Sequence, residues 1–274
     1  MTGGLVHNRE GPKNITRPLL PSRDRKPVYE PTTDSRTGED ETGCGAVLAP
    51  PCHRSGLDEA YRLTRKDGAP GIDGVTAADC EVNLETRLLD LLERIKFGRY
   101  RAPPVRRAYI PKADGSQRML GIPTFEDKVA QRAITMMLET VYEEDFCPCS
   151  YGFRPGRSAH QALRNMQNVL WAKRLYRVID LDIQKYFDSI PHSHLRAFLD
   201  QRVTDGVIGR MIDKWLNAGA VEGGLLRRTA EESPQGGVVS PCLSNIFLHH
   251  VLDEWFETEV RPRLRGGLYH CPLR

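Results

Sequence analysis

Apolar and polar residues recur along this chain in patterns that mostly predict helices. Between residues 77 and 97, apolar residues repeat at helical spacing opposite charged ones, and they are Leu84, Leu88, Leu91, Leu92 and Ile95. A second such pattern predicts a helix from Phe125 to Glu143. Weaker patterns predict helices over residues 57–66, 159–172, 189–199, 206–216 and 240–260. Ser158 and Ser240 stand where helix N-caps are expected. Together, these segments predict a chain that is largely helical after residue 57.

Two segments alternate as strands do and flank a turn signal. They are Val105–Ile110 and Arg118–Ile122, with Asp114-Gly115 between them. An Asp-Gly pair between alternating segments predicts a β-hairpin. This hairpin would bring Lys112 and Arg118 close together, one on each side of the turn.

A third strand is expected at Val178–Ile183, which is apolar except for Asp180 and Asp182. At the two-residue period of a strand, both aspartates point to the same face. Burying two unpaired carboxylates is costly, so a positive partner is expected there, and a divalent metal ion supplies one. Asp188 follows shortly after.

Composition narrows the class of protein. Residues 1–55 are poor in large apolar residues and show no sustained period, so a disordered leader is expected. The seven cysteines are scattered, and Cys147-Pro148-Cys149 has no second pair of ligands in the sequence, which favours reduced thiols over a zinc site. His249 and His250 are interpreted as polar-face residues rather than ligands. No apolar run is long enough to span a membrane, so a soluble cytoplasmic protein is expected.

The formal net charge is only +3, so any nucleic-acid surface must come from local clustering. No acidic residue occurs between Glu93 and Asp114, whereas seven basic residues lie between or beside them: Arg94, Lys96, Arg99, Arg101, Arg106, Arg107 and Lys112. Contact with phosphates is favoured over a solvated face, because turns and extended segments offer no helical charge pairing. The loop Tyr151–Ser158 adds Arg154 and Arg157 beside a helix start, which suits an anion site or a simple turn.

Four stretches in this order resemble one protein family. They are Tyr109-Ile110-Pro111-Lys112 with Arg118 and Gly121-Ile122-Pro123; Tyr151-Gly152-Phe153-Arg154-Pro155-Gly156-Arg157-Ser158; Asp182-Ile183-Gln184-Lys185-Tyr186-Phe187-Asp188; and Ser233-Pro234-Gln235-Gly236. Together they resemble the N-terminal part of a group II intron-encoded reverse transcriptase of the maturase type. Ala69-Pro70-Gly71-Ile72-Asp73-Gly74 resembles the entry segment of the same group. The resemblance covers about residues 63–265.

The resemblance implies an α+β fold in which helices pack on an antiparallel sheet, as the fingers and an incomplete palm of a right-hand polymerase. The expected divisions are a leader at 1–55, fingers at 56–170, a partial palm at 171–265 and a divergent tail at 266–274. The implied activity is RNA-directed DNA polymerisation, a nucleotidyl transfer that uses two divalent ions. The implied partners are an intron RNA template, a DNA primer and dNTP, with no membrane. The oligomeric state stays open.

The resemblance also implies roles for single residues. Asp182 matches the first catalytic aspartate, and the Ile183 carbonyl would help to hold one of two Mg²⁺ ions in the complete enzyme. Asp180 is a local competitor of Asp182, whereas Asp188 is expected to cap the next helix. Binding of the incoming nucleotide would involve four residues: Lys112, Arg118, Phe187 and Gln235. RNA contacts are expected from six arginines: Arg99, Arg101, Arg106, Arg107, Arg154 and Arg157.

The 274 residues contain no Tyr-Ala-Asp-Asp, the family motif that supplies the other catalytic carboxylates. The interpretation is therefore a truncated or frameshifted member of the family that is inactive alone. One alternative is a non-catalytic RNA-binding maturase remnant. Another is a different bacterial reverse transcriptase lineage, of the retron or diversity-generating type.

Overall fold

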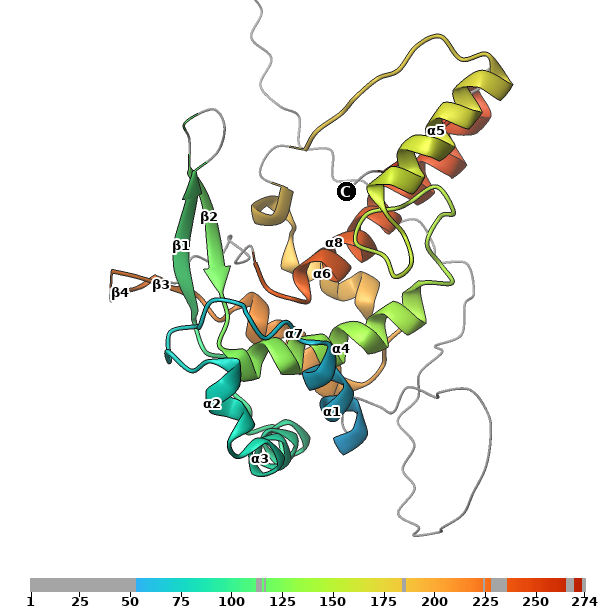
Figure 1. Ribbon diagram of the computed structural model, residues 1–274. Coiled ribbons are helices and arrows are strands. Elements are labelled where there is room, and N and C mark those ends of the chain that lie inside the picture. Colours follow the sequence, from blue (N-terminus) through green and yellow to red (C-terminus); the bar gives the residue numbers. More distant parts are fainter. Residues whose placement is uncertain are drawn as a thin grey trace, which may run out of the picture.

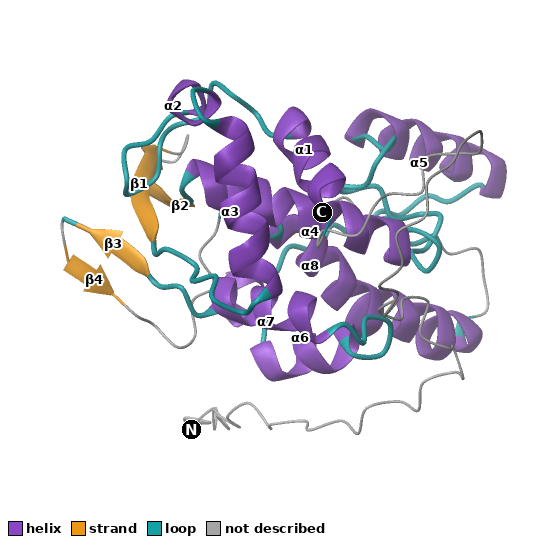
Figure 2. Ribbon diagram, turned by 90° about the horizontal axis from the view of Figure 1, so that it is seen from below, coloured by secondary structure: helices purple, strands orange, loops and turns teal. Residues whose placement is uncertain are grey.

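Helix α4 (Phe125–Tyr142) forms the centre of the fold, because residues on almost all of its sides are buried. In the computed structural model, the described residues are 53–111, 115, 117–183, 186–223, 225–227, 236–264 and 269–272. Among them, α4 contacts helices α1, α2 and α8. Figures 1 and 2 show a body of helices with the strands gathered along one edge, which gives the expected α+β class. The predicted leader lies outside the described residues up to residue 52.

Most helices begin and end close to where the sequence predicts them. The other α-helices are α1 (Arg54–Leu63), α2 (Ala77–Glu81), α3 (Leu84–Lys96), α5 (Ala159–Lys173), α6 (His192–Leu199), α7 (Gly206–Leu216) and α8 (Ser240–Leu248). Thr76 and Ser158 cap α2 and α5 through reciprocal capping boxes, and Ser158 is the cap that the sequence predicts. None of the described helices is both long enough and apolar enough to cross a membrane.

Two predicted helices differ from expectation. The helix expected from 77 to 97 is two pieces, because Asn83 leaves helical geometry (φ −134°, ψ 41°) between α2 and α3. The helix expected from 240 to 260 begins as α8 and continues in wider π-helical turns at η2 (His249–Asp253) and η3 (Phe256–Val260). Its N-cap is Val239 rather than Ser240, which is already helical. Short 3₁₀ turns are η1 (Tyr186–Ser189) and η4 (Arg261–Arg263).

The described strands form one mixed sheet of order β2-β1-β3-β4. Strands β1 (Val105–Pro111) and β2 (Gln117–Ile122) make the predicted antiparallel hairpin, with Ile110 opposite Arg118. Strands β3 (Ala220–Glu222) and β4 (Leu225–Arg227) form a second hairpin. Strand β3 runs parallel to β1, so the sheet is not purely antiparallel as expected.

The expected strand at Val178–Ile183 is not formed. Residues 175–183 have no regular secondary structure, and Ile179 and Leu181 are 82% and 84% exposed. Alternation of apolar and polar residues favours a strand only where a neighbouring strand completes its hydrogen bonds. No described strand pairs with this segment, so its apolar residues stay in solvent.

The Ala69–Gly71 segment joins the hairpin to the helices. The Arg106 guanidinium donates two hydrogen bonds to the Pro70 carbonyl, at 3.0 and 2.8 Å. On the other side, a Cβ built on Gly71 would lie 2.6 Å from the backbone of Thr124, the N-cap of α4. Only glycine permits so close an approach of two backbones. This contact sets where β1 stands relative to α4.

Candidate functional site

Hairpin β1–β2 positions the first nucleotide-binding candidates. Arg118 lies on β2 and is exposed, whereas Lys112 lies outside the described residues. At the base of the hairpin, Tyr109 donates a hydrogen bond to Glu222 of β3, and Arg107 lies 3.5 Å from the same carboxylate. Because Tyr109 and Arg107 share one face of β1, Glu222 braces the hairpin from the adjoining strand.

The Gly236–Val239 segment, which follows Gln235, is fixed between β2 and α4. A Cβ on Gly236 would lie 2.4 Å from the Gly121 carbonyl oxygen, and Gly236 has a φ of 117°. The Val239 amide donates to the side-chain oxygen of Gln131 in α4 at 3.3 Å. Gln235 itself lies outside the described residues. The segment therefore brings the immediate neighbour of Gln235 against the strand that carries Arg118.

Asp182 and Ile183 lie on the exposed segment 175–183, not on a sheet. Among the described residues, Asp182 joins no other metal-ligating side chain in a group that could hold an ion. Phe187 and Asp188 lie in the 3₁₀ turn η1, but their side chains are outside the described set. Tyr186 in the same turn donates to the Ser244 carbonyl of α8 at 2.9 Å, which attaches η1 to that helix. The described residues do not assemble a two-metal centre around Asp182.

A buried polar network beneath the hairpin was not predicted from the sequence. The Asp127 carboxylate, which is 2% exposed, accepts hydrogen bonds from Tyr100, from Trp215 at 2.7 Å and from Gln131 at 2.9 Å. Burial raises the pKa of Asp127 to about 6, although these three hydrogen bonds act to lower it. Gln131 in turn accepts the Val239 amide. The network thereby links α4, α7 and the segment after Gln235. Its one signal in the sequence is that Asp127 and Gln131 are polar residues on the inward face of α4.

The 97–101 surface is formed by Phe97, Arg99 and Arg101, which are exposed and lie within the predicted basic run. Lys214 of α7 donates to the carbonyls of Gly98 and Tyr100, at 3.1 and 2.6 Å. Since Tyr100 is buried, both arginines beside it are turned to solvent. Phe97 is 71% exposed, and the Arg99 guanidinium lies 5.3 Å from the centre of its ring. Sequence reasoning selected both arginines and missed the aromatic ring.

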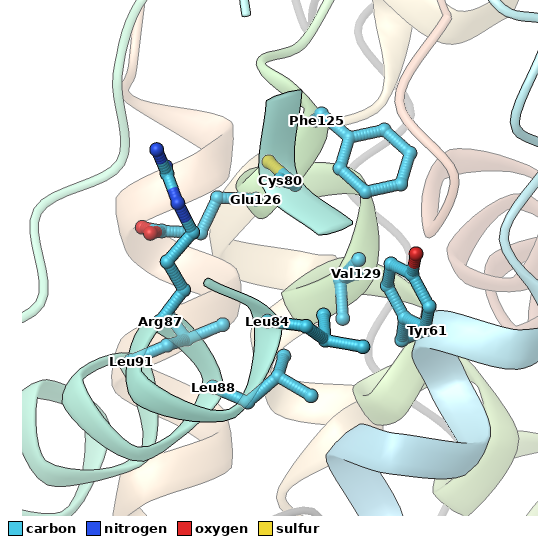
Figure 3. A pocket seen from close by; sticks show the side chains of 9 residues that line it. All are labelled: Tyr61, Cys80, Leu84, Arg87, Leu88, Leu91, Phe125, Glu126 and Val129. Carbon is cyan, nitrogen blue, oxygen red and sulfur yellow. The ribbon is translucent and has the colours of Figure 1, made fainter. Parts of the chain in front are cut away.

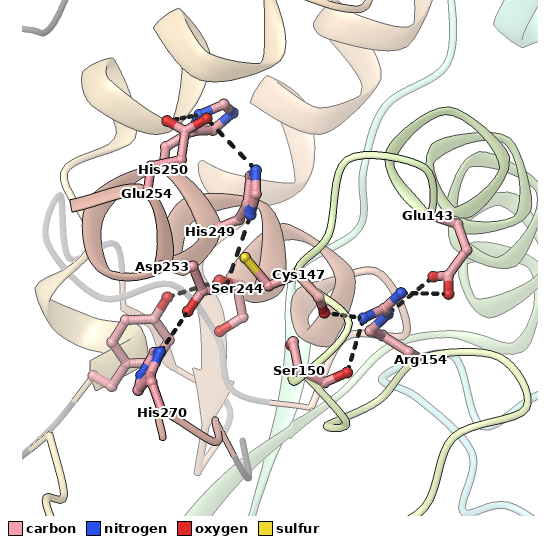
Figure 4. Close-up of polar contacts among 11 residues, drawn as sticks. Glu143, Cys147, Ser150, Arg154, Ser244, His249, His250, Asp253, Glu254 and His270 are labelled. Atoms are coloured by element: carbon pink, nitrogen blue, oxygen red, sulfur yellow. Dashed lines mark hydrogen bonds and ion pairs between the residues drawn. The ribbon is translucent and has the colours of Figure 1, made fainter. Parts of the chain in front are cut away.

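The remaining predicted arginines contact the protein itself. Arg106 and Arg107 bind Pro70 and Glu222 as described above. Arg154 has a side chain only 3% exposed and binds both oxygens of Glu143, at 3.1 and 2.6 Å (Figure 4). It also donates to the Cys147 and Ser150 carbonyls, both at 2.8 Å. Arg157 is half-buried and donates to the Pro148 carbonyl at 2.9 Å. In this conformation Arg154 holds its own loop together and does not face solvent.

A small pocket lies between α1, α2, α3 and α4 (Figure 3). Its walls are largely apolar and include Tyr61, Leu88 and Val129, whereas Arg87 and Glu126 supply its charged groups. None of the predicted site residues lines it. The pocket therefore belongs to the packing of the helices and not to the candidate site.

Comparison with known families gives one match over most of the described chain. The family described as reverse transcriptase (RNA-dependent DNA polymerase) matches residues 110–269. This range begins at the end of β1 and includes β2, the Tyr151–Ser158 loop, Asp182 and α8.

Individual relatives are consistent with that match. Protein YkfC of Escherichia coli is 41% identical over 199 residues, which cover 70% of this chain and 52% of that protein. The group II intron-encoded protein LtrA of Lactococcus lactis is 38% identical over 193 residues, which cover 70% of this chain and 32% of that protein. The chain thus spans about half or less of the length of these relatives. A solved structure titled "Partial Cas6-RT-Cas1--Cas2 complex" aligns with 76% of this chain and 34% of that one, at 19% identity and a TM-score of 0.47.

Proposed function

Because the chain belongs to the reverse transcriptase (RNA-dependent DNA polymerase) family and its relatives include group II intron-encoded proteins, we propose that it is the template- and nucleotide-binding part of an intron-encoded reverse transcriptase. The observation that carries the proposal is the contact between Gly236 and Gly121. It brings the segment after Gln235 against β2, which presents Arg118. Two family motifs far apart in sequence thereby meet beside one hairpin.

In this proposal, Lys112 and Arg118 bind the triphosphate of an incoming dNTP, since arginine offers a two-pronged donor to phosphate and lysine a point charge. Gln235 contacts the nascent base pair, and Phe187 packs against the sugar. The exposed position of Arg118 on β2 supports its role, because a phosphate can reach it from solvent. The fingers are assigned to residues 56–170 and the partial palm to 171–265.

The family reaction uses divalent metal ions, and magnesium is the ion proposed here, with Asp182 and the Ile183 carbonyl among its ligands. Among the described residues, Asp182 belongs to no group of three or more metal-ligating side chains. A two-ion site therefore needs further ligands or a rearrangement of the 175–183 segment. The expectation that the 274-residue chain alone extends no primer stays a prediction.

Primer extension tests this part of the proposal. The chain would be incubated with an RNA template, a DNA primer, dNTP and Mg²⁺, and product beyond background is not expected. Should product appear, Asp182→Asn is expected to abolish it and Asp180→Asn to leave it. Synthesis that survives Asp182→Asn would refute the role of Asp182.

RNA binding without chemistry is a second candidate, and the 97–101 surface favours it. Single-stranded RNA is bound by positive charge along the backbone together with aromatic rings on which bases stack. Phe97, Arg99 and Arg101 supply both features within five residues, and intron RNA is the proposed ligand. The nearest acid to Arg99, Glu93, lies 3.9 Å away at the surface and competes weakly with phosphate.

Binding of a labelled single-stranded RNA would be followed by fluorescence anisotropy with Mg²⁺ or with a chelator present. Binding that falls steeply with salt, survives chelation and survives Asp182→Asn is expected. Phe97→Ala is expected to weaken binding about tenfold, because stacking of one base contributes roughly 1–3 kcal/mol. Val82→Ala on the exposed link between α2 and α3 is the matched apolar control. Equal affinity of the Phe97→Ala variant and the wild type would reject this surface.

A further inference from the structure

Metal-ligating side chains that the polymerase proposal does not use lie close together where the loop after α4 meets the helix that begins with α8. Cys147 lies in the loop after α4, whereas His249 and Asp253 lie one turn apart on the π-helical turn η2. Figure 4 shows the Cys147 sulfur pointing toward His249 and Asp253. One ligand atom from each of the three residues falls within 4.8 Å of the other two. We propose that Cys147, His249 and Asp253 hold a zinc ion.

The spacing of these atoms is close to that of a ligated ion. Bonds of about 2.3 Å to sulfur and about 2.0 Å to nitrogen or oxygen hold tetrahedral ligand atoms roughly 3.3–3.6 Å apart. His249 Nδ1 lies 3.9 Å from Asp253 Oδ2. Small side-chain rotations therefore close the site around an ion without moving either backbone segment.

Burial supports an ion rather than a surface charge pair. His249 is 3% exposed and Asp253 is 0% exposed. Both ring nitrogens of His249 face a carboxylate beyond hydrogen-bond distance, Nδ1 at 3.9 Å from Asp253 and Nε2 at 3.7 Å from Glu254, so neither makes a hydrogen bond within the part of the chain that the structure describes. Burying an imidazole without hydrogen bonds is costly, and coordination satisfies the ring nitrogen that faces Asp253. His249 is thus not the polar-face residue that the sequence suggested.

The ligand types select the metal. Thiolate and imidazole ligands favour zinc over magnesium or calcium, which take oxygen ligands. His270 Nδ1 lies 4.0 Å from the other carboxylate oxygen of Asp253, and its ring stacks on Phe256 with centroids 4.4 Å apart. A second group beside a metal site commonly orients a ligating carboxylate, and His270 stands where such a group is needed.

A neighbouring group of His249, His250 and Glu254 is less suited to a metal. His250 already lies 3.1 Å from Glu254, and its ring stacks on Phe198 with centroids 4.6 Å apart. An ion pair within one helix and a ring contact account for the position of His250. Cys147, by contrast, comes from a different segment, so a metal at the proposed site would cross-link the loop after α4 to the helix that begins with α8.

Sequence reasoning rejected Cys147-Pro148-Cys149 because no second pair of ligands follows at a fixed spacing. The structure supplies the other ligands from a helix far along the chain, where His249 and Asp253 are four residues apart. Wide π-helical turns are rare and often occur at functional sites, and η2 contains both residues. The three proposed ligands therefore come together only in the folded chain, and their spacing in the sequence does not predict the site.

Metal analysis of the full 274-residue chain tests the proposal. After equilibration with Zn²⁺ and dialysis, about one zinc per chain is expected by mass spectrometry of the metal content, together with a higher melting temperature than after chelation. Cys147→Ser and His249→Gln are each expected to lower the zinc content at least tenfold. Cys80→Ala, a buried cysteine in α2, and His250→Gln are matched controls that are expected to keep it.

Circular dichroism of each variant separates loss of metal from loss of fold. In the Co²⁺-loaded chain, a thiolate-to-cobalt charge-transfer band is expected, and it should disappear in Cys147→Ser but not in Cys80→Ala. Two results would overturn the proposal: no zinc bound by the folded wild type, or zinc retained by a folded Cys147→Ser variant. Zinc lost on His250→Gln and kept on Cys147→Ser would place the ion at the other group and would equally overturn it.

Discussion

The backbone of Gly236 lies against the carbonyl of Gly121, so close that a Cβ on Gly236 would stand 2.4 Å from that oxygen. Gly236 also has a φ of 117°, a conformation that residues with a side chain rarely adopt. Both constraints act at one residue, which fixes the segment after Gln235 to β2.

Replacing Gly236 by alanine should therefore detach that segment from β2. A destabilisation of about 1–3 kcal/mol is expected, because strain of this kind costs that much per residue. Urea unfolding measures it. Gly68→Ala is the control, since its Cβ would meet the Lys128 ammonium at an ordinary 3.6 Å. If both variants were equally stable, the close approach would not constrain the fold.

Ionisation of Asp127 should make the free energy of unfolding of the wild type depend on pH. This contribution should be absent from the Asp127→Asn variant. Burial raises the pKa of Asp127 from 3.8 to about 6, so the folded state binds its proton more tightly than the unfolded chain. The contribution of Asp127 to the free energy of unfolding is then highest below about pH 4. It falls as the pH rises from about 4 to 6, and it is constant above about pH 6. The total change is roughly 3 kcal/mol.

Urea unfolding of the wild type and Asp127→Asn between about pH 4 and pH 8 tests this. The difference in unfolding free energy between the two proteins should shift in favour of the variant as the pH rises. Asp58→Asn on the exposed face of α1 controls for the general effect of removing an acid. A pH-independent difference would show that Asp127 is not responsible.

Arg154 should contribute more to stability than Arg157 in the same loop. Arg154→Ala leaves the half-buried Glu143 carboxylate and two backbone carbonyls without their donor, and the loss of hydrogen bonds to a charged group costs about 1.5–3 kcal/mol. Arg157→Ala removes a half-buried side chain and is expected to cost about 1 kcal/mol or less. Thermal unfolding of both variants measures the contrast, and similar losses would contradict it.

Arg101 should contribute to RNA affinity through charge alone. Arg101→Ala is expected to weaken binding of all RNA sequences alike and to lower the slope of log affinity against log salt by about 1. Arg62→Ala, an exposed arginine of α1 beside Glu59, is the control. Filter binding at several salt concentrations gives the slopes, and an unchanged slope would remove Arg101 from the RNA surface.

Local signals in the sequence predicted the elements that local interactions determine. The Asp-Gly pair with its flanking alternation predicted the β1–β2 hairpin, and Ser158 as a helix cap predicted the start of α5, since both depend on residues a few positions apart. The helix 206–216 was predicted at its observed bounds for the same reason.

Features that depend on distant residues were not predictable in this way. The parallel pairing of Val105 with Ala220 leaves no local pattern, and neither does the meeting of Asp127 with Trp215. For residues 178–183 the local pattern predicted an element that is not formed. Their alternation is that of a strand, but no described strand pairs with them. Of the predicted site, Arg118 and the exposed arginines Arg99 and Arg101 lie where a ligand can reach them, whereas Lys112 and Gln235 lie outside the described residues.

The pairing of β1 with β3 has a consequence for the order of folding. Val105 meets Ala220, and Tyr100 meets Trp215 across 115 positions of sequence, so the residues of hairpin β1–β2 are synthesised well before the strand that pairs with β1. Contacts between such distant residues slow folding, because a long loop must close before they form. During translation the apolar faces of α3 and α4 stay without α7 until residues beyond 216 have left the ribosome. A chaperone that covers apolar surface is therefore expected to raise the yield of folded chain more than it raises the folding rate of the completed chain.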